Sequence, residues 1–430
     1  MSSLLVRGGQ RLTGRIEPSA NKNAVLPVLC ATLLTDAEVT LRNVPEITDV
    51  ERIVRFFGEL GSTVDWDRGA KVLRIDHSTI PAGAKATLPQ AMRASIMMIP
   101  GLLVRLGEAR LEHEVKGCTL GAREIDPHVE VFRTFGADVS QDGHEIVFRS
   151  TGTGQAARMW LEYASVTTTE NFILSALTVE CTSQIVNAAC EPHVQEMCGF
   201  LEACGAKIVG KGTSMVSVEG KATLGGTDYT FNDDFHEIAT FLALSAVTGG
   251  DIAVRNGCPE HFDLIDRTFG KFGADVEHAQ GWSRLAAPAQ LKVRENFTSH
   301  LITKVEAAPW PYIPADLLPI FIALGVRADG QTMFWNKVYE GGLTWHTELA
   351  LFGGHTLLCD PHRLITFGGE QLAPATVTSP YIIRVAIALL MVASSIAGES
   401  TILDADPIRR AHPHFVDNFV ALGADVQWID

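Results

Sequence analysis

Six stretches of this 430-residue chain are apolar around nearly every face of a helical turn, which is typical of helices buried inside a domain. A second helix, apolar on one face only, follows each of them and ends at a glycine. These glycines recur 68 to 80 residues apart, so the pattern predicts six copies of one unit. The buried helices are expected at 25–34, 96–104, 171–179, 238–247, 317–324 and 385–396, and the glycines are Gly61, Gly136, Gly205, Gly273, Gly353 and Gly423.

The first copy shows the order of elements inside one unit. It reads as a small-residue helix, a strand, an amphipathic helix that stops at glycine, and a hairpin, at 23–34, 38–43, 49–60, 63–66 and 72–75. The glycine stands where the end of a helix needs a left-handed residue. A buried helix in every copy predicts an α/β fold with helices inside and sheets outside.

The length of the chain favours two domains, since single cores rarely grow this large. With three copies in each, the first domain is predicted at 22–229 and carries the loop around Cys118. The second combines 1–21 with 230–430, and the N-terminal strand segments at 4–6 and 15–18 complete it.

The composition narrows the choice of partners. A net charge of −15 excludes a nucleic-acid partner, which needs a basic surface, but allows a small anionic substrate in a local basic cleft. The eight cysteines form no CxxC pair and lie mostly among apolar residues, which indicates a reducing, cytoplasmic compartment. The N-terminus has no apolar signal core, and the longest apolar run, 385–396, is too short to span a bilayer.

Candidate chemistry lies between residues 116 and 128, in Lys-Gly-Cys-Thr-Leu-Gly-Ala-Arg-Glu-Ile-Asp-Pro-His. Lys116 and Arg123 flank Cys118 with positive charge, which favours a thiolate and attracts anions. Such a cysteine can serve as a nucleophile or a proton donor. Taken alone, the pattern favours a surface loop with one incidental buried cysteine.

Several further stretches make the whole chain resemble the enolpyruvyl transferase family. They are residues 19–27, 92–96, 117–123, 165–171 and 314–316, with Arg384 and Arg410. The likeness is greater to the branch that uses UDP-N-acetylglucosamine than to 5-enolpyruvylshikimate-3-phosphate synthase, because the Cys118 loop is typical of the former. The resemblance implies two inside-out α/β barrel domains, each of three repeats, that close over a cleft.

The resemblance also implies a role for each matching residue. Lys22, Arg123, Arg384 and Arg410 are expected to bind phosphoenolpyruvate, since guanidinium groups grip carboxylate and phosphate in bidentate fashion. Cys118 matches the family's reactive cysteine, which fosfomycin alkylates and which takes part in proton transfer to C3. Asp316 is expected to take the proton of the acceptor hydroxyl. The remaining expected acceptor contacts are Asn23, Arg93, Asp126, His128, Ser165, Val166 and Val338.

The implied reaction is addition and elimination, without a metal or a cofactor. Each residue also has a plain structural alternative. Lys22 could be a solvated lysine before a helix, although a helix N-terminus is also a natural phosphate site. The arginines could form surface ion pairs, and Asp316 could cap a helix.

The departures from the family pattern concentrate on the acceptor side. Glu124 replaces a proline, Tyr163 replaces a lysine and Thr167 replaces a glycine. Residues 234–237, Asp-Phe-His-Glu, differ from the usual Asp-Arg-Ile-Glu, and Gly342 stands where an arginine is usual. These changes indicate an acceptor that is smaller or less anionic than UDP-N-acetylglucosamine.

The alternatives are therefore transfer to the 3'-hydroxyl of UMP, as in nucleoside-antibiotic synthesis, or drift within the cell-wall enzyme. A non-catalytic nucleotide-binding paralogue is a third interpretation, supported only by Gly342. The expected partners are phosphoenolpyruvate and a uridine nucleotide, with no nucleic acid or membrane, and the sequence leaves the oligomeric state open.

Overall fold

A computed structural model describes residues 2–85, 87–89, 92–112, 125–221, 223–298 and 300–429. The chain divides into two compact units. The inserted unit comprises the described residues between Ala20 and Asn232. The terminal unit combines the chain up to Ser19 with the chain from Asp233 onward. The sequence placed these divisions at residues 22 and 229.

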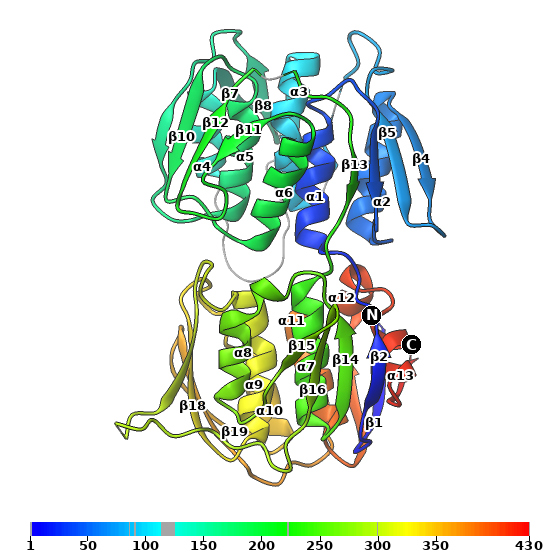
Figure 1. The fold of residues 1–430 in the computed structure, drawn as a ribbon, viewed down its shortest axis with the longest axis vertical. Helices are drawn as coiled ribbons and strands as arrows, with labels where there is room; N and C mark the ends of the chain where they lie inside the picture. The colour runs from blue at the N-terminus through cyan, green and yellow to red at the C-terminus, as the bar shows by residue number, and fades with distance from the viewer. Residues whose placement is uncertain are drawn as a thin grey trace. The chain divides into compact units, whose positions relative to one another are not determined.

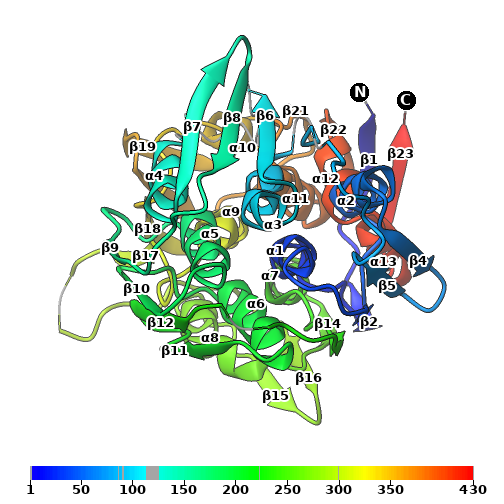
Figure 2. The same cartoon turned by 90° about the horizontal axis from the view of Figure 1, so that it is seen from above.

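Three helices form the centre of the inserted unit. They are α1 (Lys22–Thr32), α3 (Ile99–Leu106) with the preceding 3₁₀ turn η1 (Arg93–Met98), and α5 (Val166–Ala176). They lie side by side, and the sheets of this unit lie around them (Figures 1 and 2). The second helix of each repeat is α2 (Thr48–Leu60), α4 (Asp126–Thr134) or α6 (Pro192–Ala203).

The sheets of the inserted unit have the orders β13-β3-β5-β4, β6-β8-β7 and β11-β12-β10-β9. Their strands are β3 (Val39–Arg42), β4 (Thr63–Asp67), β5 (Val72–Asp76), β6 (Glu108–Glu112), β7 (Ala137–Asp142), β8 (Glu145–Ser150), β9 (Arg158–Trp160), β10 (Thr182–Val186), β11 (Lys207–Val209), β12 (Met215–Glu219) and β13 (Asp228–Thr230).

The terminal unit repeats this arrangement around α7 (Phe235–Val247), α9 (Leu318–Arg327) with η3 (Ala315–Leu317), and α11 (Ile383–Ser394), which pack against one another. All of α7 is buried, which explains why its sequence is apolar on every face. The shorter outer helices are η2 (Pro259–His261), α8 (Asp263–Gly270), α10 (His346–Leu351), α12 (Asp406–Ala411) and α13 (Phe415–Ala421).

The sheets of the terminal unit have the orders β15-β16-β14-β2, β17-β18-β20-β19 and β21-β22-β1-β23. Their strands are β1 (Ser3–Gly8), β2 (Thr13–Ile16), β14 (Asp251–Arg255), β15 (Glu277–Ala279), β16 (Trp282–Ala286), β17 (Thr303–Ala307), β18 (Gly330–Asn336), β19 (His355–Asp360), β20 (Arg363–Gly368), β21 (Thr376–Thr378), β22 (Gly398–Leu403) and β23 (Asp425–Ile429).

One topology recurs through the sheets. In every four-stranded sheet an edge strand runs parallel to its neighbour and the remaining pairs are antiparallel. In the sheet β6-β8-β7 the described residues form a parallel bridge, Thr87 to Arg110, at the corresponding edge. In the last sheet β1 lies between β22 and β23, where Leu4 is opposite Ile402 and Trp428. The N-terminal strand thus takes the place that β5 holds in the first repeat.

The six repeat glycines all have left-handed backbone conformations, with φ between 74° and 104°. Gly61 is the clearest case, since it ends α2 and donates its backbone N–H to the last turn of that helix. The prediction that these glycines are helix stops is confirmed, and a helix with buried residues lies at each of the six predicted positions. The one predicted at 96–104 begins inside the 3₁₀ turn η1 and includes the exposed Val104. Within the described residues, no helix is both long and apolar enough to cross a membrane.

Candidate active site

Lys22 is the first residue of α1 and forms a close ion pair. Its Nζ lies 2.7 Å from Oδ2 of Asp49, in the first turn of α2, and the two side chains are only 17% and 5% exposed. The side chain of Asn21 caps α1 by accepting the backbone N–H of Asn23 at 3.0 Å. Lys22 is therefore not a solvated lysine, and it stands at a helix end that attracts anions.

His128 is held in its neutral form near the start of α5. Its Nδ1 accepts from Nδ2 of Asn171 at 2.9 Å, so the ring proton lies on Nε2, which is 3.3 Å from the hydroxyl of Thr167. Burial, and then the charge of Arg93, lowers the pKa of His128 to about 3. Ser165 caps α5 by accepting the backbone N–H of Thr168 at 3.4 Å.

The other expected acceptor contacts of the inserted unit are less enclosed. Asp126 is exposed in the first turn of α4, and Val166, the first residue of α5, is half-buried. The structure thus brings His128, Arg93 and the start of α5 together. Tyr163, which stands in place of a lysine, is 56% exposed and is not part of this group.

Asp316 lies in the short turn η3 that leads into α9. It is half-buried and makes no hydrogen bond or ion pair with any other residue that the structure describes. The helix cap position before α9 belongs to Leu317 and has no side-chain hydrogen bond. The capping alternative is therefore wrong, and the carboxylate of Asp316 is available to a ligand.

Arg384 lies in the first turn of α11 with its side chain 11% exposed. Its Nη2 is 3.7 Å from Oδ2 of Asp234, whereas its buried Nη1 has no hydrogen-bond partner among the described residues. The Nη2 edge of the guanidinium group is thus near a carboxylate, whereas Nη1 is buried without a partner among the described residues. A surface ion pair would instead be exposed to solvent. Arg410 is half-buried on α12.

Val338 and Gly342 follow β18 in a tight turn. Oδ1 of Asn336 accepts the backbone N–H groups of Val338 and Tyr339, both at 3.0 Å. A Cβ added at Gly342 would lie 2.7 Å from Nδ2 of the same asparagine. An arginine cannot occupy position 342 in this turn without moving Asn336.

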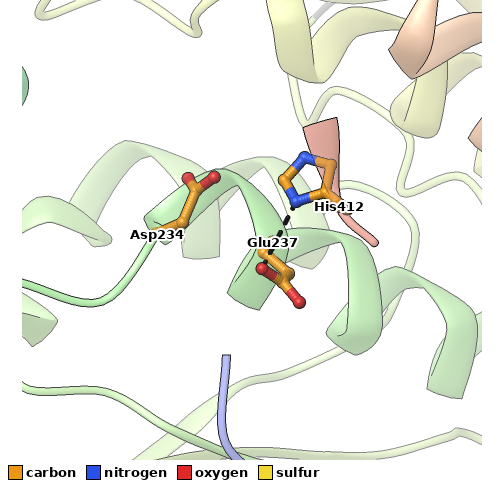
Figure 3. A group of neighbouring side chains, drawn as sticks. All are labelled: Asp234, Glu237 and His412. Atoms are coloured by element: carbon orange, nitrogen blue, oxygen red, sulfur yellow. Dashed lines mark ion pairs between the residues drawn. The ribbon is translucent and has the colours of Figure 1, made fainter. Parts of the chain in front are cut away.

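Figure 3 shows a buried group formed by Asp234, Glu237 and His412, whose possible ligand atoms lie within 4.8 Å of one another. These carboxylates already have protein partners. Glu237 accepts the backbone N–H of Ser19 at 3.0 Å and lies 3.4 Å from Nδ1 of His412. Arg384 also places positive charge beside Asp234. The group has the geometry to hold a metal, but its partners describe a network of ion pairs.

Sequence reasoning missed the partners of the two cations, Asp49 and Asp234. Asp49 gave one weak signal, since acidic residues favour the first turn of a helix. Nothing in the sequence pairs it with Lys22. Cys118, Arg123 and Glu124 lie outside the described residues.

The fold matches that of a solved enolpyruvyl transferase. The structure of NikO from Streptomyces tendae has a TM-score of 0.87 over 99% of this chain and 98% of that one, at 19% sequence identity. The chain therefore has the fold of that solved structure over nearly its whole length.

The sequence comparisons define the family itself. Residues 6–419 match the family of EPSP synthase (3-phosphoshikimate 1-carboxyvinyltransferase), and the chain belongs to this family of carboxyvinyl transferases. A UDP-N-acetylglucosamine 1-carboxyvinyltransferase from Bradyrhizobium diazoefficiens is 36% identical, over 98% of this chain and 97% of the relative. One from Borreliella burgdorferi is 32% identical over 99% of both chains.

Proposed function

We propose that this enzyme transfers the enolpyruvyl group of phosphoenolpyruvate to a hydroxyl of a uridine nucleotide, UDP-N-acetylglucosamine or a relative of it. The observation that carries the proposal is the full-length likeness, at 32% and 36% identity, to two proteins that bear that acceptor in their names. The proposal places the reaction in the cytoplasm and needs no metal or cofactor.

The phosphoenolpyruvate site would be built from cations. Lys22 at the start of α1 would hold the phosphate, and the free Nη1 edge of Arg384 would hold the carboxylate. Arg410 and the undescribed Arg123 would complete the group. The proposal assigns acceptor contacts to Asn23, Arg93, Asp126, His128, Ser165, Val166 and Val338.

The reaction would proceed in two stages. Protonation of C3, with Cys118 in the proton transfer, would let the acceptor oxygen bond to C2 as Asp316 takes its proton. The tetrahedral ketal would then lose phosphate and a proton from C3, which restores the double bond. The cations would stabilise the anionic phosphate while Asp316 faces the positive charge that develops at C2.

The proposal also includes the arrangement of the repeats within each unit. Each unit would be an inside-out α/β barrel of three repeats, with domains at 22–229 and at 1–21 with 230–430. The substrates would bind in a cleft that the Cys118 loop closes, which excludes water from the intermediate.

UMP is a second candidate acceptor. The hydroxyl of Thr167 is the hydrogen-bond partner of Nε2 of His128, so this donor is already engaged. Tyr163 carries no positive charge where the family pattern has a lysine. Both observations favour an acceptor with fewer phosphate charges at the start of α5.

Phosphate release from phosphoenolpyruvate, measured with UDP-N-acetylglucosamine, UMP and shikimate 3-phosphate, tests the proposal. Turnover with either uridine nucleotide supports it and identifies the acceptor. Turnover with shikimate 3-phosphate alone contradicts it. Binding of phosphoenolpyruvate without turnover across all three would favour the non-catalytic interpretation.

Inactivation by fosfomycin tests the placement of the thiol. We expect fosfomycin to inactivate the wild type and to leave Cys118→Ser unmodified in intact mass spectra. A variant of an exposed cysteine, Cys359→Ser, should still be modified. Equal modification of Cys118→Ser and the wild type would place the reactive thiol elsewhere.

A further inference from the structure

Arg384 occupies an electrostatically unfavourable position. It lies in the first turn of α11, where the helix dipole is positive, and this turn contains no acidic residue. Its side chain is largely buried, so solvent screens the charge only weakly. A cation in this place needs a nearby negative group to hold it in one orientation.

Asp234 is that negative group, and its two oxygens have different partners. Oδ1 accepts the backbone N–H of His236 at 2.9 Å and lies 3.1 Å from the ring Nδ1 of the same residue. Oδ2 lies 3.7 Å from Nη2 of Arg384. His236 therefore fixes the plane of the carboxylate and leaves one oxygen for the arginine.

The charge of Asp234 is secured by the same contacts. Burial alone would raise its pKa, but the hydrogen bond from His236 and the charges of His236, Arg384 and His412 hold the pKa below its ordinary value. The neighbouring Glu237 interacts instead with Ser19 and His412, and no ion pair joins Asp234 to His412 in Figure 3.

We propose that Asp234, with its carboxylate fixed by His236, is the positioning residue for Arg384. It holds the Nη2 edge of the guanidinium group and so directs the Nη1 edge toward the carboxylate of phosphoenolpyruvate. Asp234 does not contact the substrate and acts only through the arginine. The inference rests on the proposed function, because it needs phosphoenolpyruvate at Arg384.

A double-mutant cycle between Asp234→Asn and Arg384→Met tests this role. Asp234 caps α7 by accepting the backbone N–H of His236. Asparagine keeps the shape of the side chain and can keep this cap, but it removes the charge. We expect Asp234→Asn to raise the KM for phosphoenolpyruvate about 10- to 100-fold, because small misplacements of a binding group are costly. The KM for the acceptor should stay within about twofold, and the double variant should be no worse than Arg384→Met alone.

The neighbouring Asp233 supplies a matched control, because it pairs with a different arginine, Arg255, at 2.8 Å. Asp233→Asn should leave the KM for phosphoenolpyruvate unchanged. If Asp234→Asn does not fold, His236→Leu makes a milder change at the same carboxylate. We expect it to raise that KM about 3- to 10-fold, as for the loss of one hydrogen bond, and to have no effect in the Arg384→Met background.

The outcomes separate this inference from the proposed function. Effects that add in the double variant, or a KM for phosphoenolpyruvate that neither Asp234→Asn nor His236→Leu changes, overturn the positioning role while the function stands. A wild type that neither binds phosphoenolpyruvate in calorimetry nor releases phosphate overturns the function and the inference together.

Discussion

Each unit places a cation in the first turn of a buried helix and a buried carboxylate beside it, but the two pairs are built differently. In the inserted unit Lys22 is 2.7 Å from Asp49. In the terminal unit Arg384 is 3.7 Å from Asp234, and Nη1 on its other edge has no hydrogen-bond partner in the part of the chain that the structure describes. A cation at a helix N-terminus opposes the helix dipole, so neither position is explained by helix stability.

The difference follows from the shapes of the two cations. An ammonium group is a point charge, so an incoming phosphate must share Lys22 with Asp49. A guanidinium group is a planar fork, so a carboxylate can hold one edge while a ligand takes the other. Asp49 therefore neutralises Lys22 in the first pair, whereas Asp234 orients Arg384 in the second.

Loss of the lysine should have the largest effect. Lys22→Met removes a phosphate contact, for which we expect kcat/KM for phosphoenolpyruvate to fall about 10²- to 10³-fold. It also removes the close ion pair of the buried Asp49, at a cost of about 3 kcal/mol. Steady-state kinetics and thermal unfolding measure the two effects. Lys207→Met removes an exposed pair with Glu219 and should change neither. A Tm equal to that of the wild type would show that Asp49 does not depend on Lys22.

Loss of the arginine should affect activity but hardly affect stability. Arg384→Met should lower kcat/KM about 10²-fold, as expected for one lost charged contact to the reacting anion. Asp234 keeps both contacts with His236, so the Tm should fall by no more than about 2 °C. The same kinetic and thermal measurements apply. A Tm loss as large as that of Lys22→Met would show that the two pairs contribute equally to the stability of the fold.

Acid should reveal a further difference between the units. His77, in the inserted unit, is buried between the hydroxyls of Thr32 at 2.9 Å and Ser62 at 2.7 Å, and burial lowers its pKa to about 3. The unfolded chain therefore binds a proton that the folded chain does not. Between pH 6.5 and about 3, the titration of His77 alone should lower the free energy of unfolding by about 1.4 kcal/mol for each unit of acidification.

Asp234 in the terminal unit responds at lower pH. Its pKa is lowered from 3.8, so its contribution to the stability of the fold is present above that value and is lost only below it.

The contribution of His77 can thus be measured at a pH where Asp234 does not yet titrate. Thermal unfolding between pH 7 and pH 4.5 should show a shallower loss of stability in His77→Gln than in the wild type. Parallel curves for the two proteins would contradict this assignment.

The smallest expected effect concerns the start of α5. Thr167→Gly removes the hydroxyl from Nε2 of His128 and frees that donor for an acceptor phosphate. A neutral hydrogen bond contributes about 0.5–1.5 kcal/mol, so the KM for UDP-N-acetylglucosamine should fall about 2- to 10-fold. Thr178→Gly, far from this contact on the same unit, serves as the control. A higher KM in Thr167→Gly would mean that the hydroxyl itself serves the acceptor.

Much of the fold could be predicted from the sequence because it depends on local patterns. A helix such as α7 must be apolar on every face, and a stop such as Gly61 needs a residue that accepts positive φ. The residues of the site could be named through resemblance, but their pairings could not. Asp49 meets Lys22, and Asp234 meets Arg384, because separate helices place their N-terminal ends together. Such contacts depend on packing, which no local pattern encodes.

The position of β1 between β22 and β23 has a consequence for how the protein is made. During translation this strand is synthesised well before both of its neighbours. The inserted unit can therefore fold before the terminal unit completes the sheet β21-β22-β1-β23. A tag fused ahead of β1 would thus extend from an interior strand, and a slow-folding tag could hold that last sheet open.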